Sequence, residues 1–480
     1  MVPSPKQPPT LRPKQPSPPT TSSSDSSGAL PSITREEIAE RRHDLFIISD
    51  RVYDAAKFRW VHPGGAVFVS MFGGRDATLA FQSYHARPFP HASMTDRGFC
   101  VGTLDGSAVA VAEDAAHHEL AALVKPVLAK RGGAFAPTAQ LTKMVLLVVA
   151  AIALELREHF IARTWVGSFL LGLIFAWIGL NVQHDANHGS ASRRPWVNML
   201  LGLSQDWIGG SSLMWMQEHV VLHHLHTNDV EMDPDVQGGP VLRLNPDETP
   251  HAWHALQHLY IFALEMGFGV IPVFGAFLEL LVWRHRGEAK FKISRLAIWP
   301  WGFVGVALHL GFYARFLVLP FVAGASVNDP VWATAGKVAL LLSVGGGYLA
   351  FFFFLSHNFE GANFVDGAQE VTGACEYPVG SSFVHQQVAS SCNVGGATLA
   401  IFNGGLNYQI EHHLFPRIAH SHYPHIAPVV KAFCERKGIP YVHFDTIGEN
   451  VASVRRGLKA MARDETAPRV LRVKEGGKRI

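Results

Sequence analysis

The chain has 480 residues, which is long enough for two or three domains. Its formal net charge is only +2, so the composition gives no reason to expect a nucleic-acid partner. Charged residues make up only 17% of the chain and aromatic residues 11%, which favours a membrane-embedded part joined to a soluble part. The four cysteines form no CxxC pair, which argues against a zinc ribbon or a disulfide framework and fits a reducing compartment.

The N-terminal 32 residues are rich in Pro and Ser and contain no apolar run. This composition cannot form a packed core, so a disordered tail is predicted for residues 1–32. The tail also lacks the apolar stretch of a secretory signal peptide. We therefore expect membrane insertion to depend on internal apolar segments.

Residues 33–104 are predicted to form a small soluble domain with strand-like and short helical runs. His62 begins the turn HPGG, and His85 ends a helix-like run that contains Phe81. Two imidazoles on separate elements, with apolar walls between them, suit axial ligation of a haem iron from both sides. A haem ligated in this way transfers electrons and binds no substrate at iron. The alternative is that both are ordinary loop histidines.

The same block resembles a cytochrome b5 domain. RVYD, HPGG, GRDAT, an aromatic residue and a final His follow one another in the order of that family. The resemblance covers residues 33–104 and implies an α+β fold with a bound haem b. It also implies that His62 and His85 are the axial ligands of the haem.

A polar, partly helical linker is predicted for residues 105–140, and apolar segments fill residues 141–445. A membrane-spanning helix needs about 20 mostly apolar residues. Four segments are expected to span, in two hairpins, and a C-terminal tail is expected from 446 to 480. The four segments are 143–156 with its adjoining residues, 165–180, 296–320 and 331–356.

Two further apolar segments are expected not to cross the membrane. The segment 254–283 contains Glu265, Pro272 and Glu279, so we expect it to lie at the interface or fold back. The segment 196–213 is interrupted by polar residues and a pair of glycines. Four crossings then leave every histidine-rich stretch on one side of the membrane.

A cluster of basic residues just before the third spanning segment sets the expected orientation. Lys and Arg gather on the cytosolic side of membrane proteins, and the loop between the last two spans contains neither. Both termini and the histidine-rich stretches are therefore predicted to be cytosolic. The basic residues are Arg284, Arg286, Lys290, Lys292 and Arg295.

Three polar stretches beside the apolar segments are rich in histidine: NVQHDANHGS, QEHVVLHHLHTN and LNYQIEHHLF. Residues at i and i+4 share a helix face, so His184/His188, His219/His223 and Gln409/His413 are each expected to point toward one site. Imidazole ligands suit iron, copper or zinc. The histidines of these stretches, with one more in FFFFLSHNFEG, exceed the needs of one metal ion, so two ions are predicted.

These histidines could have two other roles. Buried histidines can serve local hydrogen bonds or sense pH, but three clusters at helical spacing on one membrane face favour a metal site. A zinc metalloprotease is disfavoured, because its HExxH signature places Glu directly after the first His. Here His184 is followed by Asp185.

The pattern resembles the membrane fatty acyl desaturases, whose three histidine boxes match HDANH, HVVLHH and QIEHH. EMDPD at 231–235 and HNFEG at 357–361 also resemble that family. The resemblance implies an all-α membrane domain with four transmembrane helices, a cytosolic cap and two non-haem iron ions. It implies metal-ligand roles for His184, His188, His219, His223, His224, His357, His412 and His413. Gln409 is expected to bind metal or support a ligand, His226 to support one weakly, and His420, His422 and His425 to be ordinary.

A b5-like domain fused to a chain with Gln at the head of the third box resembles the front-end desaturases. These enzymes place a new double bond between an existing one and the carboxyl end. The resemblance implies O2, a long-chain polyunsaturated acyl-CoA or acyl-phospholipid, membrane lipid and NADH–cytochrome b5 reductase as partners, and the endoplasmic reticulum membrane as location. Each turnover takes two electrons, which a fused haem domain delivers at high effective concentration.

Several details, among them RRPWVN, GGLNYQIEHHLFPR and YPHIAP, look most like algal delta-5 desaturases that act on twenty-carbon chains. Delta-6, delta-8 and delta-4 enzymes and sphingolipid delta-8 desaturases share the architecture. An acyl hydroxylase or acetylenase on the same scaffold differs only in product. The non-enzymatic alternative is a membrane-anchored b5 electron carrier with a structural histidine-rich region.

Overall fold

A computed structural model describes residues 30–41, 44–106, 112–270, 273, 301–366, 368–369, 374–375, 382–463 and 470–472. Most of the predicted tail over 1–32 lies outside these residues. So do the basic cluster at 284–295 and most of 271–283, the second part of the segment that we expected not to span.

The N-terminal domain is a small α+β unit, as predicted. Its sheet has the strand order β1-β4-β3-β2, with β1 parallel to β4 and the other pairs antiparallel. All side chains of β2 are buried, and Ser49 at φ 56° forms the tight turn into β3. The elements are β1 (Ser32–Ile33), α1 (Arg35–Glu40), β2 (Leu45–Ile48), β3 (Arg51–Asp54), α2 (Ala55–Phe58), α3 (Ala66–Met71), α4 (Thr78–Tyr84), α5 (His91–Asp96) and β4 (Cys100–Leu104).

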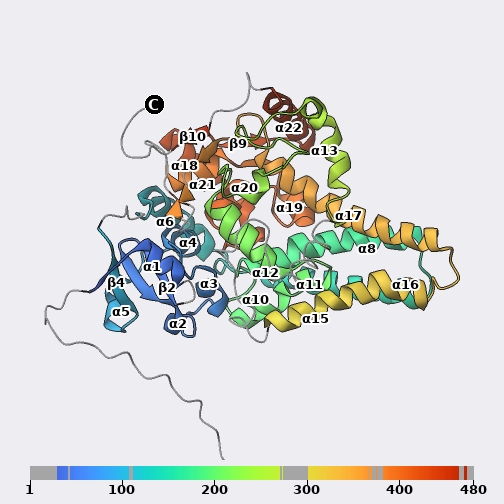
Figure 1. Ribbon diagram of the computed structural model, residues 1–480, viewed down its shortest axis with the longest axis horizontal. Coiled ribbons are helices and arrows are strands. Elements are labelled where there is room, and N and C mark those ends of the chain that lie inside the picture. The colour runs from blue at the N-terminus through green and yellow to red at the C-terminus, as the bar shows by residue number, and fades with distance from the viewer. Residues whose placement is uncertain are drawn as a thin grey trace, which may run out of the picture.

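Within the described residues, four helices are long and apolar enough to cross a membrane, at the four predicted places. They form two hairpins that project from the rest of the molecule (Figure 1). Both hairpin turns lie at the far end, where the Ala325 N–H donates to the His159 carbonyl at 2.7 Å. The helices are α7 (Thr138–Phe160), α8 (Trp165–Ile178) continuing through η1 (Gly179–Gln183) and α9 (His184–Asn187), α15 (Trp301–Tyr313) continuing through η7 (Ala314–Val318) and α16 (Leu319–Val322), and α17 (Val331–His357).

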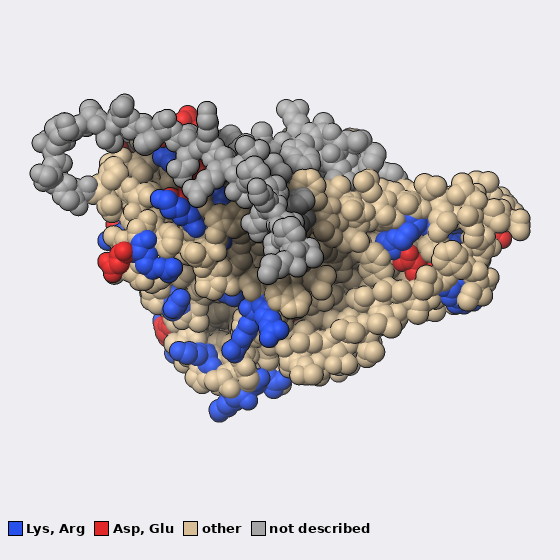
Figure 2. Space-filling view, turned by 90° about the horizontal axis from the view of Figure 1, so that it is seen from below, with Lys and Arg blue, Asp and Glu red and all other residues tan. Residues whose placement is uncertain are grey.

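The surface of the hairpins suits contact with lipid. Val145, Leu146 and Val149 on α7 are each more than half exposed, as expected where a helix faces hydrocarbon. In Figure 2 the projecting part of the molecule is mostly uncharged, whereas Lys and Arg gather at the opposite end. The charged end is the one that holds the b5-like domain (Figure 1).

The cap over the hairpins is helical apart from short strand pairs: in the described residues β8 pairs with β9, β5 with β10 and β6 with β7. The segment 196–213 forms short helices and no span, as predicted. The helices are α6 (Ala115–Ala129), α10 (Pro195–Gly202), α11 (Ser204–Trp207), α12 (Ser212–Trp215), η2 (Met216–His223), η3 (Pro234–Val236), η4 (Ala252–Leu256), α13 (Gln257–Glu265), α18 (Phe383–Ala389), α19 (Ala397–Asn403), α20 (Gln409–Leu414), η8 (His420–His422), α21 (Tyr423–Lys437) and α22 (Ile447–Met461). The strands are β5 (Phe364–Asp366), β6 (Ala368–Gln369), β7 (Ala374–Cys375), β8 (Cys392–Val394), β9 (Val442–Phe444) and β10 (Val470–Arg472).

Two features connect parts that the sequence suggested were separate. One apolar core joins Val67 and Ala80 of the b5-like domain to Met216, Val220 and Phe383 of the cap. The region predicted as a C-terminal tail begins with α22, whose Val454 and Leu458 are buried in a core shared with α13 and α17. The b5-like domain is thus docked on the cap through a continuous core.

Candidate metal centre and haem pocket

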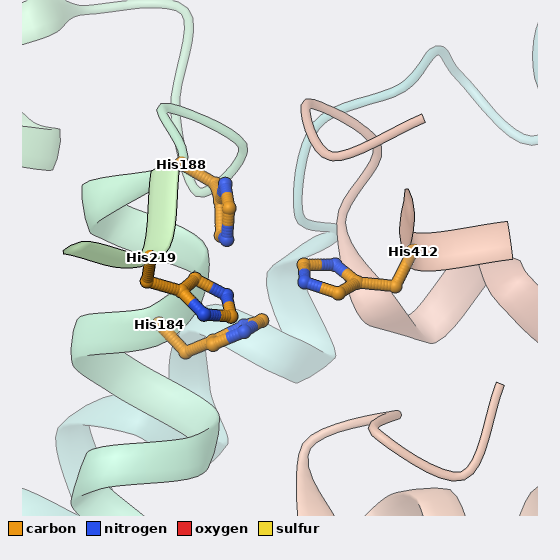
Figure 3. A group of neighbouring side chains, drawn as sticks. All are labelled: His184, His188, His219 and His412. Carbon is orange, nitrogen blue, oxygen red and sulfur yellow. The ribbon is translucent and has the colours of Figure 1, made fainter. Parts of the chain in front are cut away.

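Four of the predicted histidines form a first group at the inner end of the second span. His184 and His188 lie at α9, His219 on η2 and His412 on α20, and one ring nitrogen of each lies within 4.8 Å of the others. Figure 3 shows His184, His188 and His219 pointing from one side toward His412 on the other. All four side chains are at most 6% exposed. All three histidine boxes therefore contribute to one point.

A second group stands beside the first. His223, His357 and His413 also place ring nitrogens within 4.8 Å of one another, and all three are buried. His357 is the last residue of α17, so a spanning helix carries this ring directly. The Gln409 side-chain amide lies 3.0 Å from His357 Nε2 and 3.1 Å from His413 Nε2. Gln409 therefore belongs to the second group.

His224 lies between the two groups. Its Nε2 is 3.2 Å from His219 Nε2 and 3.0 Å from His412 Nε2, and its ring stacks on His413 with centres 4.3 Å apart. The sequence predicted His219 and His223 to share one site, and a ring nitrogen of each lies within 4.8 Å of the other and of an Asp235 carboxylate oxygen, with the ring centres 5.3 Å apart. His219 also belongs to the first group and His223 to the second. Because η2 is π-helical, hydrogen bonds joining i to i+5 bring His224 onto the face of His219 as well.

Side chains and carbonyls behind the rings fix their orientation. The Nδ1 of His357 bonds to the Ser390 carbonyl at 3.0 Å, and that of His413 to Gln387 Oε1 at 2.8 Å. Asp233 lies 3.1 Å from His223 Nδ1. Bonds at Nδ1 leave Nε2 as the ligand atom, the usual arrangement around metal-bound histidine.

The protonation of these rings suits metal binding. Burial, together with neighbouring imidazoles, holds the pKa of His219 and His412 well below the usual range, so both are neutral ligands at neutral pH. Burial also acts to lower the pKa of His223, but the carboxylates of Asp233 and Asp235 outweigh it and raise the pKa to about 9. A metal cation bound there would displace that proton.

Several buried polar atoms of the cluster have no hydrogen-bond partner. They include both ring nitrogens of His184, Nε2 of His188 and Oε1 of Gln409. A buried unsatisfied polar atom costs about 1–3 kcal/mol, so a cluster of them is stable only if something else satisfies them. The donor set of imidazoles and one amide fits two iron ions.

The predicted haem ligands face each other across an apolar cavity. The ring centres of His62 and His85 are 6.2 Å apart. An imidazole bound to a metal at about 2 Å has its ring centre about 3 Å from it, so two rings on opposite sides of one metal have centres about 6 Å apart. Phe46, Phe58 and Phe72 are among the apolar side chains that line the cavity. The cavity therefore fits a haem with two axial histidines.

Each axial ring is held by a backbone carbonyl. His62 Nδ1 donates to the Gly65 carbonyl at 3.1 Å, and His85 Nδ1 donates to the Phe81 carbonyl at 2.9 Å. A Cβ on Gly64 would lie 2.9 Å from the His62 ring, which explains glycine at this position of HPGG. Burial lowers the pKa of His85 to about 4, so the ring is neutral at physiological pH and can bind iron.

The remaining histidines named from the sequence lie outside both groups. His226 is buried, and burial lowers its pKa to about 4. His420, expected to be ordinary, supports the cluster: its Nδ1 lies 2.9 Å from the carboxylate of Asp185, the neighbour of His184. His422 bonds to the Phe135 carbonyl and His425 is exposed.

Sequence reasoning missed several residues of the site. Asp233 was noted only inside the family motif EMDPD, and nothing in the local sequence marked Gln387. Nor did it mark Tyr84, the residue before His85, whose hydroxyl lies 2.9 Å from His188 Nδ1. Such partners come from distant parts of the chain, so local spacing carries no signal for them.

Comparison with known proteins agrees with this geometry. Residues 161–445 match the family "Fatty acid desaturase", and residues 34–105 match "Cytochrome b5-like Heme/Steroid binding domain". The chain is 48% identical to an acyl-lipid (7-3)-desaturase of Diacronema lutheri, over 91% of this chain and 94% of the relative. It is 46% identical to an acyl-lipid (7-3)-desaturase of Rebecca salina, over 90% and 93%. It is 30% identical to an acyl-lipid (8-3)-desaturase of Physcomitrium patens, over 87% and 88%.

The family matches, the fold and the histidine groups indicate the same class of protein. A b5-like haem domain and a membrane domain with two histidine groups occur in one chain, in the order and over the length of these relatives. A simple b5 electron carrier would need no such cluster. The chain belongs to the fatty acid desaturase family, as a cytochrome b5-fused front-end desaturase, an oxidoreductase that uses haem and a di-iron centre.

Proposed function

We propose that the eight clustered histidines are the iron ligands, divided between two ions, and that Gln409 completes the second set. His184, His188, His219 and His412 would hold one ion, and His223, His357 and His413 the other, with His224 between them. The observation that carries this proposal is the pair of adjacent, buried groups of ring nitrogens. The bonds at Nδ1 and the unpartnered atoms of His184 and Gln409 support it.

The proposed substrate is a long polyunsaturated acyl chain carried on a lipid, desaturated with the regiochemistry that two relatives bear in their names as (7-3). Their identity to this chain, 48% and 46%, exceeds the 30% of the (8-3) relative. The delta-5 regiochemistry expected from the sequence is the alternative, ranked second because identity to the (7-3) relatives is higher. Front-end desaturation as such does not depend on this choice.

The protein's own part in the reaction is to hold the iron ions and to shield them from water. A di-iron centre supplies the reduction of O2 and the removal of two hydrogens from neighbouring methylenes. The histidine side chains of the cluster are at most 6% exposed, so water is excluded from the space that they surround. The first group includes His184 of α9 and the second includes His357, the last residue of α17, so both groups lie at ends of membrane-spanning helices.

The haem domain is proposed to receive electrons from NADH–cytochrome b5 reductase and to pass them to the di-iron centre one at a time. We place the chain in the endoplasmic reticulum membrane, with both termini and both cofactor sites cytosolic. The shared location of the two histidine groups at one end of the hairpins supports a single catalytic side. The absence of Lys and Arg in the loop between the last two spans supports the other side as lumenal.

Expression in yeast fed with polyunsaturated acids of 18 to 22 carbons tests this proposal. The expected result is a new acid with one more double bond on the carboxyl side of the existing ones, first in the lipid fraction and not in acyl-CoA. Locating the new bond by mass spectrometry decides between the (7-3) and delta-5 regiochemistry. A hydroxylated product, or no product from any of these acids, would contradict desaturation.

A further inference from the structure

The b5-like domain touches the metal centre directly, through one tyrosine. The Tyr84 hydroxyl lies 2.9 Å from His188 Nδ1, across 104 positions of sequence. Tyr84 is the last residue of α4 and precedes His85, while His188 belongs to the first histidine group. We propose that Tyr84 positions His188 in the metal centre and links it to the haem ligand. This inference rests on the ligand role proposed above for His188.

The hydrogen bond fixes which nitrogen of His188 can bind metal. Nε2 of His188 has no hydrogen-bond partner and belongs to a ring that faces His184, His219 and His412. A neutral imidazole carries its proton on one nitrogen, so Nδ1–H donates to the Tyr84 oxygen and Nε2 keeps its lone pair for a metal. Among the described residues, the Tyr84 hydroxyl is the hydrogen-bond partner of His188 Nδ1, so a Phe at position 84 leaves that N–H buried without an acceptor.

The docking of the two domains holds this contact in place. The Phe68 ring lies 5.7 Å from that of Tyr84 and reaches across to Gly189, the residue after His188. Gly189 has φ +73°, and a Cβ there would lie 3.1 Å from the Phe68 ring. A side chain at position 189 would therefore push the b5-like domain away from His188.

Tyr84 also forms a bonded route between the two cofactor sites. The route runs from the His85 ring through the main chain to Tyr84, and through one hydrogen bond to His188. Each passage would take one electron from a ferrous haem held by His62 and His85, which becomes ferric, to a ferric ion held by the histidine groups, which becomes ferrous. No bond forms or breaks and the phenol keeps its proton. Two passages supply one turnover, and the reductase restores the ferrous haem.

Tyr84→Phe tests the proposal in the full chain, because the ring and its packing remain. Tyr53→Phe is the matched control: its hydroxyl bonds to His91 Nδ1 at 2.7 Å in the same domain, away from the metal centre. Three quantities are measured: the haem spectrum, the 2,2′-bipyridine concentration that removes half of the non-haem iron, and the rate of haem reoxidation. That rate is followed after the reduced enzyme is mixed with O2 and substrate lipid.

We expect Tyr84→Phe to keep its haem, to lose iron at a roughly tenfold lower chelator concentration and to reoxidise haem at least about tenfold more slowly, the size typical of lost supporting bonds behind a metal ligand. Tyr53→Phe should match the parent. Parent-like values for Tyr84→Phe, loss of its haem, or equal effects of both variants would each overturn the proposal. A parent enzyme without non-haem iron would instead refute the ligand roles, and with them the proposed function.

Discussion

The haem pocket and the di-iron centre both use imidazoles to bind iron, but different kinds of partner hold the rings in the two sites. In the haem pocket each ring is held by a carbonyl three or four residues away, Gly65 for His62 and Phe81 for His85. In the di-iron centre the partners are distant in sequence, such as Ser390 for His357. The support of the haem ligands is thus local in sequence, whereas the support of the metal centre comes from several segments of the membrane domain and from the docked b5-like domain.

Because of this difference, substitutions should affect the two sites differently. A change at an axial histidine should act on haem alone, because the carbonyls that hold His62 and His85 lie within the b5-like domain. A change behind the metal centre can act from any of several segments, because four separate stretches of chain deliver its nitrogens. The following predictions set the two sites against each other.

The largest effect is expected from His188→Ala, which removes a nitrogen from the centre of the first group. Desaturation should fall to background while the haem spectrum stays unchanged, because His62 and His85 are untouched. Fatty-acid profiles and a reduced-minus-oxidised spectrum of the same membranes measure both. His425→Ala, at an exposed histidine, should keep activity. Activity retained by His188→Ala would contradict its ligand role.

His62→Ala is expected to have the reverse effect, with haem lost and non-haem iron kept. Losing one axial ligand should abolish the b5-type haem spectrum and reduce activity to what a separate cytochrome b5 can support. Non-haem iron should remain at the parent level, because no residue of the cluster changes. Iron analysis after haem extraction measures this, and a parallel loss of non-haem iron would show that the two sites are not independent.

A smaller effect is expected from Asp233→Asn, which weakens the support of His223. In the parent, the Asp233 carboxylate raises the pKa of His223 against the lowering effect of burial. Asparagine is neutral and has no such effect, so the pKa of His223 should fall from about 9. Loss of such a support typically costs about 10–100-fold in metal affinity or activity. Product formation and iron content measure the effect, with exposed Asp445→Asn as control. Unchanged values for both would mean that His223 needs no carboxylate.

The smallest effect is expected from Arg417→Gln at the haem pocket. Arg417 of the membrane domain lines the haem cavity, and its guanidinium lies 5.6 Å from the centre of the Phe135 ring. Haem carries two carboxylates, and a partly exposed ion pair contributes up to about 1 kcal/mol, or roughly fivefold in haem retention. Transfer of haem to apomyoglobin measures retention. Exposed Arg436→Gln is the control, and equal rates for both would exclude this ion pair.

The sequence predicted the spans, the haem ligands' cavity and which histidines gather, because hydropathy and the spacing of the boxes are local patterns. It could not predict that His224 would also lie beside His219, because only the π-helical turn of η2 brings residues five apart onto one face. Nor could it predict the bond from Tyr84 to His188, which depends on how two domains dock. The ligand roles themselves stay predictions until iron is measured.

Helix α17 ties the metal centre to the membrane itself. A helix of 27 residues is about 40 Å long, more than the roughly 30 Å of a bilayer's hydrocarbon core, so it must tilt or extend beyond it. A change in bilayer thickness changes the tilt of such a helix. Because His357 is the last residue of α17 and belongs to the second group, a change in that tilt is expected to move one imidazole of the metal centre. The thickness of the surrounding lipid is therefore expected to act on the geometry of the catalyst.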